Sequence, residues 1–134
     1  MEVQVDSFHQ PFLIKTEEYE NLIAAPNSSS CETWATFLAY EDPCLKGYFE
    51  TRARYVSDSL KGALFNSIGE ARASVVVSGQ VVGVWQWNRT MSSLTVELFR
   101  KLTKSERQKY EEALADLSLF VSATDTVVQA SEAN

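Results

Sequence analysis

Apolar and polar positions alternate most clearly over SVVVSGQVVGVWQWN, residues 74–88. Two apolar runs flank Ser78-Gly79 there, and a two-residue turn with glycine in second place matches the twist of antiparallel strands. The pattern therefore predicts a β-hairpin, followed by a third strand over 94–100. Shorter runs predict strands over 2–6, 12–14 and 33–40.

Helical spacing is clearest toward the C-terminus, where Thr103 and Glu106 have the spacing of a capping box. The apolar residues that follow on one helix face are Tyr110, Ala113, Leu114, Leu117, Phe120 and Val121. We expect this helix to end near Val121. Thr16 and Ser57 are placed to cap shorter helices.

These elements predict an α+β fold, a small antiparallel β-barrel or strongly curved sheet with short helices and the C-terminal helix packed on it. A length of 134 residues suits one domain. We expect a single β-barrel-like domain over 1–121 and a flexible polar tail over 122–134. Between two strands, Asp42-Pro43 begins a turn that Gly47 can close by adopting a positive φ.

Trp85 and Trp87 can be read in two ways. They either form a platform on which nucleic-acid bases stack or fill the core of a curved sheet. In a regular strand they share a face with Val81 and Gly83, while the opposite face is more polar. That pattern favours inward-pointing indoles, with Gly83 leaving room for an indole or a crossing backbone.

Charge is unevenly distributed along a chain whose net charge is −6. Residues 46–109 carry eleven basic and five acidic side chains, whereas both flanking segments are acidic. A phosphate-binding face needs Lys and Arg, so a local basic patch within this middle segment is a candidate. The candidate DNA-binding residues are Arg52, Arg54, Arg89, Arg100 and Lys101.

Other chemistry has little support in the sequence. Cys31 and Cys44 lack metal-site spacing, and His9 has no neighbouring nucleophile or ligand pattern. Phosphate-cradling glycine motifs are missing, so we expect no metal, no cofactor and no catalytic residue. With neither an apolar run of about 18 residues nor a signal peptide, we expect a cytoplasmic protein without membrane contact.

Three motifs in a fixed order resemble a known family. They are D-P-x-L-x-G, then R-x-R, then V-x-V-x-G-x-V-x-G-x-W, followed by a strand and a helix. The matching residues are Asp42, Pro43, Leu45, Gly47, Arg52, Arg54, Val75, Val77, Gly79, Val81, Gly83 and Trp85. From residue 2 to about 121 the chain is similar to the C-terminal β-barrel region of the winged-helix DNA-binding domain family, which includes DNA glycosylases acting on bulky adducts and interstrand crosslinks.

This resemblance implies a module of a DNA-binding or repair system that lacks catalysis. The family places its catalytic Q-x-Q or Q-x-D pair in winged-helix domains to which nothing here corresponds. Gln86-Trp87-Asn88 imitates such a pair but lies in the hairpin, and we reject it as catalytic. Ser78 also replaces the usual Asp before the turn glycine.

Two classes of function remain open, with a third behind them. The first is weak, non-specific DNA binding, alone or beside a protein that carries winged-helix domains. The second is a protein-interaction or self-association module without DNA binding, with a homo-oligomer as one form. The third is a small ligand held inside the barrel.

Overall fold

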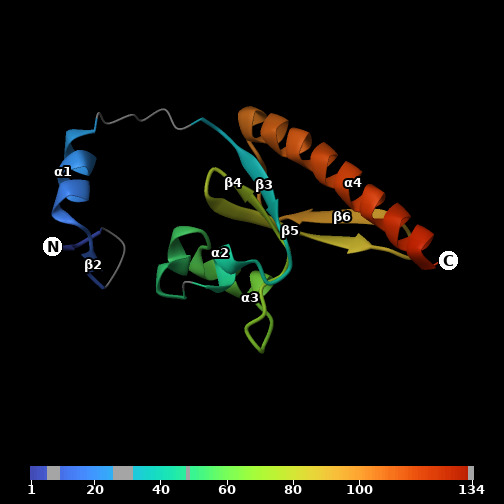
Figure 1. The fold of residues 1–134 in the computed structure, drawn as a ribbon, viewed down its shortest axis with the longest axis horizontal. Coiled ribbons are helices and arrows are strands. Elements are labelled where there is room, and N and C mark those ends of the chain that lie inside the picture. Colours follow the sequence, from blue (N-terminus) through green and yellow to red (C-terminus); the bar gives the residue numbers. More distant parts are fainter. Residues whose placement is uncertain (6–9, 26–31, 48, 133–134) are drawn as a thin grey trace. The chain divides into compact units, whose positions relative to one another are not determined.

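A computed structural model describes residues 1–5, 10–25, 32–47 and 49–132. The chain divides into two compact units, Met1–Cys31 and Glu32–Asn134. Both contain helix together with antiparallel strands, which confirms the α+β class (Figure 1).

The first unit is a small hairpin followed by a helix. Strand β1 (Glu2–Val3) pairs antiparallel with β2 (Phe12–Leu13), and the N-terminal ammonium donates a 2.8 Å hydrogen bond to the carbonyl of Ile14. Helix α1 (Thr16–Ala24) follows, with Lys15 rather than Thr16 in the N-cap position. None of its residues is buried within the structure.

The second unit is built on a four-stranded antiparallel sheet (Figure 1). Its strands are β3 (Ala35–Leu38), β4 (Ser74–Val77), β5 (Gln80–Asn88) and β6 (Ser93–Leu98), in that order across the sheet. Since β3 and β6 pair on one side only within the described residues, this sheet is open. Of the two predicted forms, the described residues show an open sheet and not a closed barrel.

The predicted hairpin is confirmed, but one of its predicted faces is wrong. Both turn residues have positive φ, 47° at Ser78 and 82° at Gly79, as the two-residue turn requires. A register shift follows, because Val75 pairs with Gly83 while Val76 pairs with Val81. The bulge leaves Val82 without a partner in β4. Side chains before the bulge therefore point to the opposite faces from those that regular alternation predicts, and Val81 shares a face with Val84 and not with Trp85.

The sheet buries side chains on both faces. The chain between β3 and β4 contributes to one side and contains four short helices: α2 (Pro43–Lys46), η1 (Phe49–Arg54), η2 (Asp58–Leu60) and α3 (Lys61–Leu64). Leu45 of α2, Leu64 of α3 and Val56, which lies between η1 and η2, form a buried cluster with Val76, Val81 and Val84. On the other side Tyr110 of the C-terminal helix packs with Val75, Val77 and Val82. The sheet is thus the middle layer.

Helix α4 (Lys104–Glu132) begins as predicted and ends later. The Thr103 amide donates to the Glu106 carboxylate at 2.9 Å and the Glu106 amide donates to Oγ1 of Thr103 at 3.3 Å, which confirms the capping box. The helix continues past the predicted end at Val121 into the segment expected to be a flexible tail. Its predicted apolar face is correct at Tyr110 and Val121, both buried, but Phe120 is 69% exposed.

Candidate nucleic-acid interface

The D-P-x-L-x-G motif forms helix α2 and serves packing. Oδ1 of Asp42 accepts a hydrogen bond from the Cys44 amide at 2.9 Å, so Asp42 caps the helix, and Leu45 is buried. The predicted positive φ at Gly47 is wrong, because this residue is right-handed with φ −74°. Glycine is needed there for space, since a Cβ atom would lie 2.9 Å from the Pro43 carbonyl oxygen.

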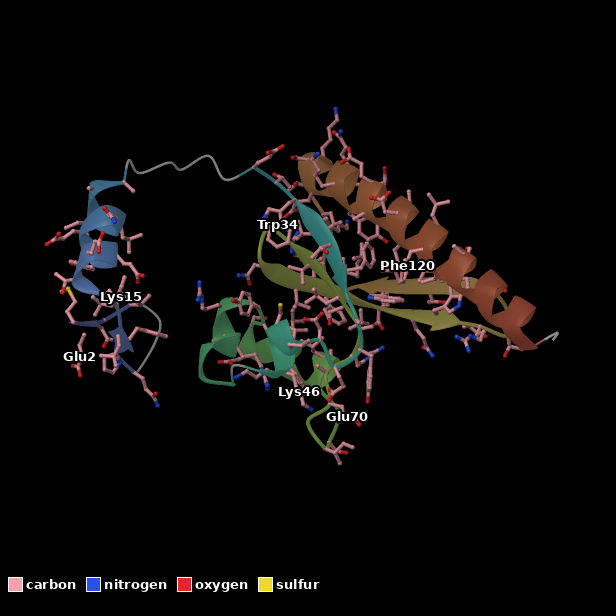
Figure 2. All side chains as sticks on the ribbon, viewed as in Figure 1. Glu2, Lys15, Trp34, Lys46, Glu70 and Phe120 are labelled. Atoms are coloured by element: carbon pink, nitrogen blue, oxygen red, sulfur yellow. The ribbon has the colours of Figure 1, made fainter. Side chains whose placement is uncertain are left out.

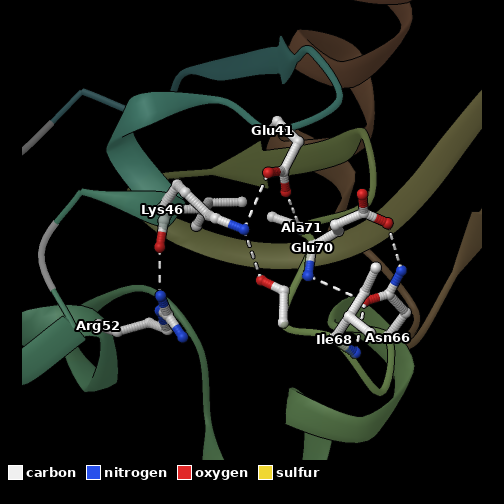
Figure 3. A network of polar contacts seen from close by, with 9 residues as sticks. Glu41, Lys46, Arg52, Asn66, Ile68, Glu70 and Ala71 are labelled. Carbon is white, nitrogen blue, oxygen red and sulfur yellow. Dashed lines mark hydrogen bonds and ion pairs between the residues drawn. The ribbon is translucent and has the colours of Figure 1, made fainter.

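Arg52, the first arginine of R-x-R, is hydrogen-bonded to a backbone carbonyl (Figure 3). Its Nε donates to the Leu45 carbonyl at 2.9 Å, and its guanidinium carbon lies 4.2 Å from the centre of the Phe65 ring. The side chain is part-buried. Arg52 therefore ties the end of α2 to η1 and packs on an aromatic ring.

A polar network follows the end of β3 (Figure 3). The Glu41 carboxylate pairs with Nζ of Lys46 at 2.8 Å and accepts a hydrogen bond from the Ala71 amide. Nζ of Lys46 also donates to the Gly69 carbonyl at 2.8 Å. The hydrogen bond from Lys46 lowers the pKa of Glu41, so the pair stays charged at neutral pH. These bonds fix the segment around Tyr40 beside the segment that enters β4.

The remaining predicted residues lie at separate places. The Arg54 guanidinium is 5.7 Å from the Tyr55 ring centre, and the Arg54 carbonyl accepts from Nε2 of Gln80 at 2.6 Å. Arg100 makes two bonds to Glu106, of 2.7 and 2.9 Å, and exposed Lys101 is its neighbour in sequence. Because Arg89 follows β5 and Arg100 follows β6, the antiparallel register places them at opposite ends of these strands.

The structure brings Arg100 together with Lys101, and Arg52 lies with Arg54 on η1. Neither pair includes Arg89. The five residues thus occupy three locations, and the guanidinium groups of Arg52 and Arg100 bind protein oxygens. A phosphate face built from all five is not what the geometry favours.

A groove that the sequence reasoning missed lies where β3 ends and β4 begins. It has a volume of about 370 Å³. Its lining residues are Ala39, Tyr40, Arg72, Ala73, Trp85, Gln86 and Trp87. We call it the aromatic groove. Three aromatic rings and one guanidinium are the side-chain types that hold unpaired bases and their phosphates.

Trp85 forms the inner wall of the aromatic groove. Its Nε1 donates to the Leu38 carbonyl at 2.8 Å, and its ring meets Phe37 edge-to-face at a centroid distance of 6.3 Å. The indole is half-buried and packs against the sheet core on the α4 side. The predicted inward orientation of Trp85 is confirmed, and the crossing backbone expected at Gly83 is that of β6.

Trp87 and Tyr40 line the same groove. Trp87 is half-buried, whereas Tyr40 is 57% exposed. A hydrogen bond with the Glu70 carboxylate raises the pKa of Tyr40 to about 12, so the phenol stays neutral. Nδ2 of Asn66 donates to the same Glu70 carboxylate at 2.6 Å, which holds it in position.

Arg72 supplies the cationic group of the groove. Its Nη1 donates to the Ala63 carbonyl at 3.0 Å, which leaves other guanidinium donors of this exposed side chain for a ligand. In the sequence Arg72 stands alone in ARAS, directly before a predicted strand, and no motif marks it. Only the folded chain shows that it comes next to the two tryptophans.

Gln86-Trp87-Asn88 divides between two roles. Gln86 lines the aromatic groove, whereas Oδ1 of Asn88 accepts from the Met91 amide at 3.1 Å in the turn before β6. Asn88 is thus a turn residue.

Metal and membrane chemistry can be judged for the described part of the chain. No cluster of three or more His, Cys, Asp or Glu side chains within it could hold a metal ion. No helix there is both long and apolar enough to cross a bilayer. The Cys44 thiol is exposed, and hydrogen bonding to Asp42 raises its pKa. His9 and Cys31 lie outside the described residues.

Comparison with known proteins gives two similarities. Residues 2–120 match the family described as DNA glycosylase AlkZ-like. Among solved structures, Streptomyces sahachiroi DNA glycosylase AlkZ matches with a TM-score of 0.61 and 24% sequence identity, over 84% of this chain. The match covers 28% of the AlkZ chain, so this chain corresponds to less than a third of that structure. No match is found among curated proteins.

Proposed function

This chain belongs to the DNA glycosylase AlkZ-like family, and we propose that it is a non-catalytic module that binds DNA through the aromatic groove. The observation that carries the proposal is the meeting of Tyr40, Trp85 and Trp87 with Arg72 in one hollow. Base stacking on aromatic rings accepts any base, because every base has a π-face. The module therefore prefers unpaired or distorted DNA over regular duplex.

The electrostatics of the groove support weak binding. Arg72 is its cation, whereas Glu70 lies at the Tyr40 hydroxyl, and the whole chain carries a net charge of −6. Long-range repulsion from that charge opposes the phosphates. We expect a dissociation constant near the ~10⁻⁴ to 10⁻⁶ M of non-specific contacts. Arg54, Arg89 and Lys101 add peripheral contacts in this proposal.

Catalysis belongs elsewhere in the proposed assembly. We assign base excision to winged-helix domains of the kind that precede a C-terminal barrel-like region in longer family members, with this chain corresponding to that region. The proposal fits the structural role of Asn88 in its turn and the 28% share of the AlkZ chain that is matched. A cytoplasmic location is part of the same proposal. The purified chain should release no base from DNA.

The test is a binding titration with a labelled single-stranded oligonucleotide and its duplex at low salt. Trp87→Ala should weaken single-strand binding by about 1–3 kcal/mol, the range for one stacked base, which is roughly a five- to 150-fold loss. Trp87→Phe keeps an aromatic ring and should retain most of the affinity. Arg72→Gln should also weaken binding.

Trp34→Ala is the matched control, because Trp34, the residue directly before β3, is 43% exposed and does not line the aromatic groove. Its binding should equal that of the wild type. Thermal melting of every variant separates lost stacking from lost fold. Equal affinities of wild type, Trp87→Ala and Arg72→Gln in folded protein would overturn the proposal.

A second candidate function is protein interaction without DNA binding. The observation that favours it is the open outer edge of β3 in the described sheet. If the titration shows no DNA binding, this function replaces the first.

A further inference from the structure

Strand β3 offers unused backbone groups on its outer side. The Ser78 amide donates to the Trp34 carbonyl at 2.9 Å, so Trp34 points its backbone groups toward β4. Backbone direction alternates along a strand, and Ala35 and Phe37 therefore turn their N–H and C=O groups away from β4. Within the described ranges, no strand pairs with that outer edge. The edge also lacks the Lys or Pro that commonly protects one.

A hollow flanks this edge on each face of the sheet. On the side of the short helices, a mostly apolar hollow of about 240 Å³ is lined by Trp34, Thr36 and Leu38 together with Leu45 and Tyr55. On the α4 side, a hollow of about 380 Å³ begins at Ala35 and Trp34 and is walled by α4. Figure 2 places Trp34 near the start of the strand. Alternate side chains of an added strand would meet one hollow each.

The two hollows differ in charge. The α4 wall carries Glu112 and Asp116, and Glu32 lies at the opening, against the single cation Lys109. Nζ of Lys109 lies 3.1 Å from the Glu112 carboxylate, so one acidic group is paired and two remain in excess. Hydrogen bonding to Lys109 lowers the pKa of Glu112, which keeps it ionised at neutral pH. This hollow is therefore acidic, while the opposite one is mostly apolar.

We propose that the outer edge of β3 binds an extended segment of a partner protein as an added strand, and that this segment alternates apolar with basic residues. Its backbone pairs with Ala35 and Phe37. Its apolar side chains enter the hollow beside Trp34 and Leu38, and its basic side chains face Asp116 and Glu32. A second copy of this chain is the poorer occupant, because it would bring one acidic hollow against another. The proposal is separate from DNA binding.

The probe is a synthetic peptide that alternates valine and lysine, compared with a valine–glutamate peptide of equal length. The valine–lysine peptide should bind, and it should slow amide hydrogen exchange at Ala35 and Phe37. The valine–glutamate peptide should bind at least about tenfold more weakly, since it places like charges together. Methylating alternate backbone nitrogens of the valine–lysine peptide should abolish binding without any change to the protein.

Asp116→Lys should weaken the binding of the valine–lysine peptide by about tenfold or more. Asp58→Lys makes the same charge change on η2, away from the edge, and should leave binding near the wild-type level. Three results would each overturn the proposal: equal binding of the two peptides, no protection of Ala35 and Phe37, or protection of these amides in a dimer without peptide.

Discussion

Gly83 shows how one residue sets the packing of the sheet. A Cβ atom at this position would lie 2.5 Å from the Glu97 carbonyl oxygen and 3.0 Å from a Leu98 methyl carbon. Both atoms belong to β6, and a backbone oxygen cannot rotate away as a side chain does. The glycine is therefore required by the close approach of two strands.

Gly83→Ala should lower the free energy of unfolding by about 1–3 kcal/mol, the usual cost of overpacking. Gly62→Ala is the matched control, since Gly62 is exposed in α3 and nothing beyond its chain neighbours and the helix backbone lies within 4 Å of the added carbon. That change should be neutral or stabilise by up to about 1 kcal/mol. Urea unfolding of both variants checks the difference, and equal stabilities would contradict the account of Gly83.

Glu106 makes the free energy of unfolding depend on pH in the acidic range. Its bonds to the Arg100 guanidinium, and then to the Thr103 amide, lower the pKa of Glu106 from 4.5 to about 2. Since the folded-state pKa is the lower one, the stabilisation is complete above about pH 4.5 and is lost as the pH falls toward 2. Because the Arg100 side chain is 43% exposed, solvent screens the pair, and we expect a loss of about 1 kcal/mol.

Arg100→Gln should remove most of this acid dependence. The measurement is the free energy of unfolding across that pH range for wild type and variant. Lys101→Gln removes a neighbouring positive charge that has no part in the two bonds to Glu106, and it should retain the wild-type slope. Equal slopes in the wild type and Arg100→Gln would contradict the role given to this pair.

Elements with a strong local signal were predictable from the sequence. The capping box of α4 and the two-residue turn of the hairpin rest on residues that act on their own neighbours. The reversal of faces at Val81 and Val82 was not, because a bulge depends on how β4 and β5 register. The prediction of a positive φ at Gly47 was wrong for a related reason. Glycine is required there because a side chain would meet the Pro43 carbonyl, and in the sequence this requirement cannot be told from that of a turn.

The candidate site was predictable only in part. Basic residues are visible in the sequence, but their partners are not, and the guanidinium groups of Arg52 and Arg100 proved to bind oxygens of Leu45 and Glu106. Arg72 joins Trp85 and Trp87 only because β4 pairs with β5. A site made of residues that follow β3, precede β4 and belong to β5 has no local spacing to detect.

At the scale of the whole molecule, the same D-P-x-L-x-G and R-x-R motifs that carry the family resemblance build one side of the core. Asp42 caps α2, Leu45 fills the core and Arg52 closes the end of α2. The motifs therefore identify the fold of this module rather than a reaction. The match covers 28% of the AlkZ chain, and whether this part alone releases a base is the question that the proposed function answers in the negative.

In the proposed function, the aromatic groove binds single-stranded DNA with Arg72 on a phosphate. The most direct measurement is the slope of log affinity against log salt for single-stranded DNA, with wild type, Arg72→Gln and Arg52→Gln. Each phosphate contact contributes about −0.7 to this slope, so Arg72→Gln should flatten it by about that amount while Arg52→Gln, in folded protein, leaves it unchanged. A slope of zero, or flattening by Arg52→Gln and not by Arg72→Gln, would contradict the claim.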